Sequence, residues 1–111
     1  MDWLNNIAQT IINIIARANY GTFPESLDDW RTVANRFGIK ILIVRHPTAC
    51  SACLLDDILI VIWHRDLREI MRRICHEIAE FLLYQEWESP FIVPYSVPKH
   101  IIARNIELCN V

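Results

Sequence analysis

The chain lacks several features that would place it in common functional classes. Its 11 Lys and Arg residues form no long run and its net charge is −2 at pH 7, so electrostatics predict no nucleic-acid surface. Its longest apolar runs fall far short of the roughly 20 residues that span a bilayer. No internal repeat and no low-complexity tract interrupts it. We therefore expect a protein that binds neither nucleic acid nor a membrane.

The N-terminus also lacks the basic region that opens a secretory signal peptide, and carries Asp2 and several Asn residues instead. Without export, the four Cys residues should stay reduced in a cytoplasmic protein. Cys50 and Cys53 form a C-x-x-C motif, but they fall in or beside a predicted strand. Redox pairs of this kind usually stand at a helix N-terminus. We expect all four cysteines to serve as small buried apolar residues.

The length of 111 residues predicts one domain over 1–111. Apolar residues make up 53% of the chain, whereas a typical domain reaches about 45–50% even with glycine counted. This excess predicts apolar surface that meets a partner, a second copy in a homodimer, or a missing segment.

The spacing of apolar residues predicts an α+β fold. Helical spacing covers four segments, at 3–18, 24–37, 66–87 and 98–111. Gly21 and Gly38 should end the first two helices, and Pro24 and Pro98 suit the first turns of the second and the last.

Short β-branched runs predict strands at 39–46 and on both sides of a turn at Asp56-Asp57. We expect the helices to pack with a small antiparallel sheet of about three strands. The last helical pattern is still running at Val111, which predicts that a C-terminal segment is lacking or that a partner completes the fold. A frayed terminus is the alternative.

The stretch CHEIAEFLL, on the longest predicted helix, contains the residues best suited to chemistry. His76 and Glu80 stand four residues apart on one helix face, so both can reach one ion. Imidazole nitrogen and carboxylate oxygen are ordinary zinc ligands. Glu77 occupies the position of the general base in H-E-x-x-H enzymes. Glu107, on the polar side of the last helix, is a candidate third ligand, and His100 is a weaker one.

A charged helix face explains the same residues without a metal. On a helical wheel, His76 and Glu80 lie nearly opposite the apolar stripe of their helix. Ion pairs Glu69–Arg73 and Arg73–Glu77, each spaced four residues apart, could stabilise such an exposed face.

The wider sequence resembles the ImmA/IrrE family of metallopeptidases over about 26–111. The similarity begins at SLDDWRTVANRFGIKILIV and continues through the hairpin ACLLDDILIVIW into the helix, where CHEIAEFLL stands for the family's H-E-x-x-H. It ends at NIELCNV, which is similar to the second signature, E-x-x-A-N-x-F-A. The resemblance implies a zincin-like active-site helix and a protein substrate, a helix-turn-helix repressor.

Carried over by position, the resemblance implies that His76, Glu80 and Glu107 bind Zn²⁺ or Mn²⁺ and that Glu77 activates water. Glu80 replaces the second His of the family, and one residue fewer separates Glu107 from Asn110. One His and two Glu leave a Zn²⁺ centre with a net charge of about zero instead of about +1, so bound water would be less acidic. Two functions remain open: a metal-dependent peptidase-like domain with weakened or lost activity, and a non-catalytic binding or regulatory module that keeps the fold.

Overall fold

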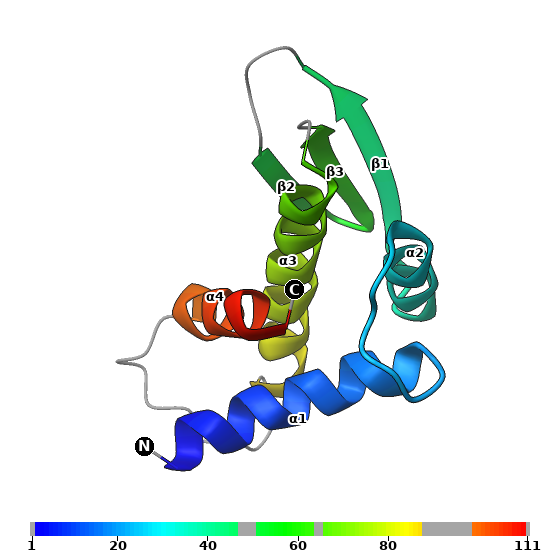
Figure 1. Ribbon diagram of the computed structural model, residues 1–111. Helices are drawn as coiled ribbons and strands as arrows, with labels where there is room; N and C mark the ends of the chain where they lie inside the picture. The colour runs from blue at the N-terminus through cyan, green and yellow to red at the C-terminus, as the bar shows by residue number, and fades with distance from the viewer. Residues whose placement is uncertain (1, 47–50, 64–65, 88–98, 111) are drawn as a thin grey trace.

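The computed structural model describes residues 2–46, 51–63, 66–87 and 99–110. The elements follow in the order α1 (Asp2–Ala18), α2 (Leu27–Arg36), β1 (Lys40–Arg45), β2 (Ser51–Leu55), β3 (Ile58–Trp63), α3 (Leu67–Trp87) and α4 (Lys99–Asn110) (Figure 1). The predicted α+β class is confirmed. The expected position of Pro98 lies outside the described residues.

The three strands form one mixed sheet in the order β1-β3-β2. β2 and β3 form the predicted antiparallel hairpin, with Leu55 paired with Ile58 across the turn. β3 pairs with β1 in parallel, from Lys40 beside Ile58 to Arg45 beside Trp63. The expectation of a wholly antiparallel sheet is therefore wrong in one pairing. After β1 the chain reverses direction and forms β2 at the opposite edge of the sheet. It then reverses again and forms β3 between the two, parallel to β1.

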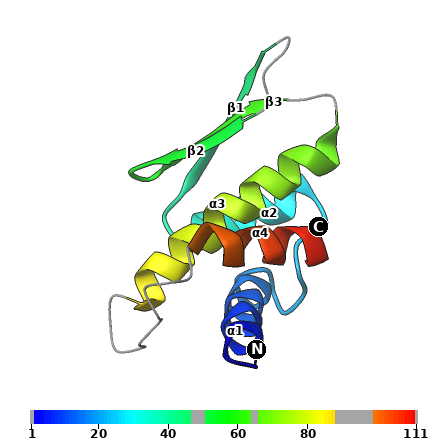
Figure 2. The same cartoon turned by 90° about the vertical axis from the view of Figure 1, so that its left-hand side faces the viewer.

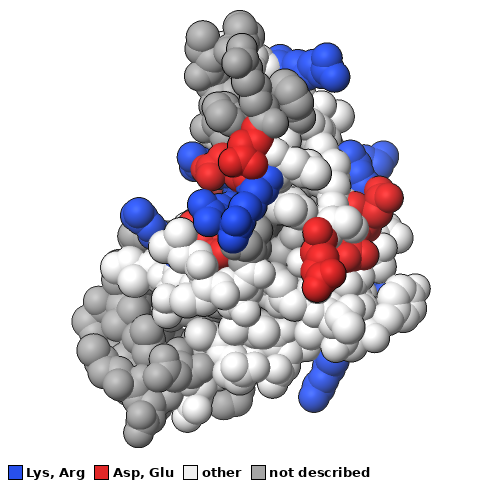
Figure 3. Space-filling view, viewed as in Figure 1, with Lys and Arg blue, Asp and Glu red and all other residues white. Residues whose placement is uncertain are grey.

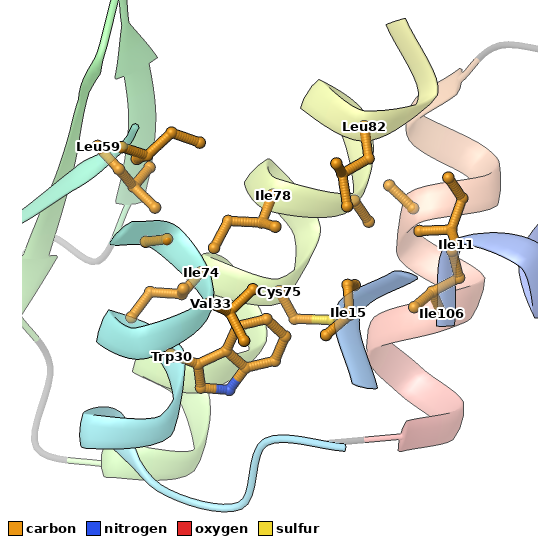
Figure 4. Packing of buried hydrophobic residues seen from close by; sticks show 14 of the residues in the cluster. Ile11, Ile15, Trp30, Val33, Leu59, Ile74, Cys75, Ile78, Leu82 and Ile106 are labelled. Atoms are coloured by element: carbon orange, nitrogen blue, oxygen red, sulfur yellow. The ribbon is translucent and has the colours of Figure 1, made fainter. Parts of the chain in front are cut away.

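Helix α3 is the centre of the molecule. It runs beneath the sheet, with α4 on one side and α2 on the other, while α1 crosses below (Figures 1 and 2). Side chains from all four helices and the sheet meet around it (Figure 4). The largest fully buried side chains are Trp30, Ile11, Ile15, Leu59, Ile70, Ile74, Ile78, Leu83, Ile102, Ile106, Val33 and Val61.

The buried surface of α3 is wider than its predicted apolar stripe. Ile74, Ile78 and Leu82 are buried as expected, but Leu67 at the start of the stripe is 50% exposed. Cys75 is buried as well, on the neighbouring side of the helix. A helix with a sheet above it and other helices beside and below it buries more than one stripe.

One face of the sheet packs on α3, and none of the described elements covers the other face. Ile41, Leu59 and Val61 are buried beneath the sheet. Successive strand residues point to opposite faces, so their neighbours point away from α3. Leu42 and Leu55 on that side are 49% and 57% exposed. Part of the exposed apolar surface in the described residues therefore lies on the outer face of the sheet, and Leu67, Ile101 and Leu108 expose apolar side chains on α3 and α4.

Helix α2 begins three residues later than predicted. Pro24 lies before the helix, and Ser26 is the N-cap, with its Oγ accepting a hydrogen bond from the backbone N–H of Asp29 at 3.1 Å. A Ser at this position satisfies one of the helix's free N–H groups. The side-chain cap, rather than the proline, sets where α2 starts.

Helices α1 and α2 end in the same backbone motif but with different residues. At the end of α2, Gly38 has φ +71° and the N–H of Ile39 donates to the carbonyl of Ala34 at 2.8 Å. At the end of α1, the N–H of Gly21 donates to the carbonyl of Ala16 at 2.8 Å. The left-handed position before that N–H is held by Tyr20, at φ +57°. Gly21 was expected to cap α1; its φ is also positive, but Tyr20 holds the capping position.

Replacing Tyr20 with Gly should stabilise the protein by about 1 kcal/mol. A left-handed conformation costs an L residue about 1–2 kcal/mol, and Gly avoids this cost. Loss of the stacking between Arg36 and the Tyr20 ring, at 5.2 Å, offsets part of the gain. Urea unfolding would measure the change, with Gly38→Ala as the matched variant that should destabilise. An unchanged or lower stability for Tyr20→Gly would contradict the proposed strain.

None of the helices in the part of the chain described here is long and apolar enough to cross a membrane.

Candidate metal centre

The structure brings His76 together with two of the predicted ligands. His76 lies in the middle of α3, and α4 packs alongside it. The Nε2 atom of His76 is 3.3 Å from Oε2 of Glu80, one turn later on the same helix. Its Nδ1 atom is 3.3 Å from Oε1 of Glu107 on α4. Two residues 31 positions apart in the sequence thus meet because α3 and α4 pack together.

These three side chains do not form a solvated face. The exposed fractions are 21% for the side chain of His76, 27% for Glu80 and 15% for Glu107. Helix α4 and strand β2 both pack against α3, which a helical wheel of α3 alone cannot show. The His76 cluster is therefore less exposed than the charged helix face considered from the sequence, whether or not it holds a metal.

The ion pairs expected along α3 are only partly formed. Glu69 lies 3.3 Å from Arg73, as predicted, and 3.9 Å from Arg72. Within the described residues, Arg73 makes no ion pair with Glu77, because its guanidinium is directed back toward Glu69. No cationic side chain among the described residues therefore lies within ion-pair distance of Glu77.

A hollow of about 480 Å³ opens beside the cluster, between β2, α3 and α4. Its walls include Ser51 and Ala52 of β2, Glu77 of α3 and Arg104 of α4. Basic and acidic side chains lie interleaved on this side of the molecule (Figure 3). The part played by Ser51 and Ala52 could not be predicted, since only the sheet order places β2 next to α3.

The pKa of Glu77 is raised above its ordinary value of 4.5. Burial of the carboxyl group is the main cause, and the nearby charge of Glu80 adds to it. His76 and Arg73 act in the opposite direction without cancelling the increase. Glu77 therefore binds a proton more readily than a solvated glutamate, which is useful in a group that must take a proton from water.

In protein free of metal, Glu77→Gln should raise the free energy of unfolding at about pH 7 and change it little at about pH 4. Because the pKa of Glu77 is raised on folding, the folded protein favours the protonated carboxyl group. The resulting stability is present in full below pH 4.5 and is lost as the pH rises through the folded-state pKa. Gln imitates the protonated form at every pH. Urea unfolding with EDTA at both pH values measures this. Glu69→Gln, which loses the contact with Arg73, should give no such gain at neutral pH, and an equal effect of Glu77→Gln at both values would contradict the prediction.

The cysteines only partly follow the expectation of burial. Cys75, beside His76, is fully buried, and burial raises the pKa of its thiol. Cys53 and Cys109 are exposed, so the expectation is wrong for them. Cys50 lies outside the described residues, as does the side chain of His100, the weaker ligand candidate.

The donor set suits a divalent cation in its chemistry. One imidazole and two carboxylates are acceptable ligands for Zn²⁺ and, with two hard oxygen donors, for Mn²⁺. The atoms do not converge on one point, because the two carboxylates contact opposite nitrogens of the His76 ring. Accordingly, in the described ranges no group of three or more His, Cys, Asp or Glu side chains is arranged to hold a metal ion. The chemical type of the three residues and their closeness suit a metal ion. Binding by all three would require Glu80 or Glu107 to move to the side of the His76 ring that the other carboxylate occupies.

Comparison of the chain with protein-family models, with curated proteins and with solved structures gives no match.

Proposed function

We propose that this chain is a metal-dependent, peptidase-like domain that acts in the cytoplasm. His76, Glu80 and Glu107 would bind one Zn²⁺ or Mn²⁺ ion. The observation that supports this is the contact of one imidazole with carboxylates from two helices, in a cluster that is mostly shielded from solvent. By resemblance to the ImmA/IrrE family, the substrate is a helix-turn-helix repressor.

The chain's own residues supply the other requirements of peptide hydrolysis. A bound cation supplies Lewis acidity. Glu77, beside the cluster and lining the same hollow, would accept a proton from the attacking water, and burial adapts its pKa to this role. In the described sheet β2 is an edge strand and borders the hollow, so its outer backbone groups can pair with an extended peptide.

Metal binding is the direct test. We expect purified protein to bind about one Mn²⁺ or Zn²⁺ with micromolar affinity in calorimetry, and His76→Ala and Glu107→Gln to lose this binding. Glu69→Gln is the matched control, because Glu69 lies on the same helix but contacts only arginines among the described ion pairs. Absence of binding by either metal would refute the proposed function.

The hydrolytic role has a separate test. Glu77→Gln should keep the metal affinity within about threefold and lower the cleavage of a candidate repressor by roughly 100-fold or more, as expected for a general base. Cleavage that persists in Glu77→Gln would show that another group activates water.

A non-catalytic binding module is the second candidate function, and two observations favour it. Without a cation, His76 still links α3 to α4, because one ring nitrogen contacts Glu80 and the other contacts Glu107. The outer face of the sheet, which exposes apolar side chains and is covered by none of the described elements, is suited to a second copy of the chain. Sedimentation at several concentrations tests this: a strict monomer would count against homodimerisation through that face.

A further inference from the structure

A second and larger hollow lies on the other side of the molecule from His76. It has a volume of about 770 Å³ and lies between the exposed face of α2, the start of β1 and the α1–α2 loop. It shares no described lining residue with the hollow at the candidate metal centre. Sites for small molecules commonly measure about 300–1,000 Å³, so the size suits a ligand of that class.

The described walls of this hollow, here called the α2 groove, are basic. Arg31, Arg36 and Lys40 line it, against one carboxylate, Asp57. None of the three cations has a carboxylate within ion-pair distance among the described residues, although Arg72 at the other hollow does. The guanidinium of Arg31 is held in place by a hydrogen bond of 3.0 Å that its Nη1 donates to the carbonyl of Ile41. These charges favour an anion in the groove.

Tyr20 adds an independent observation. Tyr20 lines the groove and is 80% exposed, with the Arg36 guanidinium 5.2 Å from the centroid of its ring. Its backbone occupies a left-handed position where the equivalent turn after α2 uses Gly38. A large aromatic side chain is thus kept in solvent at a conformational cost, and strain of this kind is often found at binding sites. The exposed ring offers a flat surface for stacking.

We propose that the α2 groove binds a nucleoside phosphate. The base stacks on Tyr20, and the phosphate oxygens accept hydrogen bonds from Arg31, Arg36 and Lys40. Cations alone would also suit an acidic peptide, but such a peptide makes no use of an exposed aromatic ring. The combination of ring and cations within one groove favours a ligand that is both planar and anionic.

Three ligands separate the contribution of the stacked base from that of the phosphates. Their binding is measured by calorimetry at low salt, with EDTA present so that the metal centre is not involved. ATP should bind saturably, and its affinity should fall as salt is added. Tripolyphosphate, which has the charge without the base, should bind about tenfold more weakly, since stacking of one base on an aromatic ring is worth that order. Adenosine, which lacks the charge, should bind more weakly than either.

Variants then assign the binding to this groove. Arg36→Gln and Lys40→Gln should each weaken ATP binding about tenfold, the usual effect of losing one hydrogen bond to a charged group. Tyr20→Gly, expected to be more stable than the native protein, should lower the ATP affinity to that of tripolyphosphate. Arg17→Gln, an exposed arginine outside the described lining, and His76→Ala should leave ATP binding unchanged.

Three results would overturn the proposal: no saturable ATP binding, equal affinities for ATP and tripolyphosphate, or tighter binding of an oligoglutamate peptide than of ATP. Because His76→Ala is included and EDTA is present, failure here is distinct from failure of the metal-dependent function. Thermal unfolding of each variant shows that a lost affinity is not a lost fold.

Discussion

Replacing Glu80 with His should raise the affinity for Zn²⁺ by at least about tenfold. Mutating residues that only hydrogen-bond to metal ligands commonly alters metal affinity about 10- to 100-fold, so exchanging a ligand itself should have an effect at least that large. The variant exchanges a hard carboxylate for an imidazole, which Zn²⁺ accepts readily, and it raises the net charge of the loaded centre by one. It also removes the negative charge that, next to burial, raises the pKa of Glu77. Titration against a chelating dye measures the affinity.

Two comparisons make the Glu80→His result informative. Glu69→His, on the same helix, places an imidazole beside arginines and should leave the Zn²⁺ affinity unchanged. The preference for Zn²⁺ over Mn²⁺ should increase in Glu80→His, because one oxygen donor has been replaced by nitrogen. Equal Zn²⁺ affinities for Glu80→His and the native chain would show that position 80 does not contact the ion.

Replacing Trp30 with Ala should destabilise the protein by about 3–5 kcal/mol, a large share of the total stability of a small domain. Trp30 is fully buried between α2 and the core, and Phe23 meets it edge to face with ring centroids 5.6 Å apart. Removal of the indole leaves a cavity and ends that contact. Urea unfolding followed by circular dichroism measures the loss.

Trp30→Phe is the matched control for the cavity. The Nε1 atom of Trp30 is buried and has no hydrogen-bond partner among the described residues, so a Phe ring loses volume but no hydrogen bond described here. We expect it to cost less than half as much as Trp30→Ala. If Trp30→Phe were as destabilising as Trp30→Ala, an unrecognised partner of the indole N–H would be implied.

The sequence was a good guide at most places where the structure depends on local rules. The α1 and α3 helices, the turn at Asp56-Asp57 and the end of α2 at Gly38 follow from apolar spacing and backbone preference. The start of α2 was misjudged because Pro24 and Ser26 both favour a helix start, and the hydrogen bond to the Ser26 side chain decides between them.

What depends on neighbours in space was harder to predict. The parallel pairing of β1 with β3 involves residues 18 positions apart, and no short pattern in either strand specifies its partner. For the candidate site, sequence spacing placed Glu80 beside His76, and Glu107 was proposed only as a candidate, with the resemblance in its favour. The contact of Glu107 with Nδ1 rather than Nε2 follows from how α4 crosses α3, which no pattern in either helix contains.

The position of β3 between β1 and β2 has a consequence for the order of folding. The β2–β3 hairpin joins residues close in sequence and needs only a two-residue turn, so it can form within microseconds. β1 can complete the sheet only after β3 is in place, and it must close a longer loop to do so. We expect contacts of the hairpin to govern the folding rate and those of β1 the unfolding rate. The strand that borders the α2 groove would then be the last to join the sheet and the first to leave it.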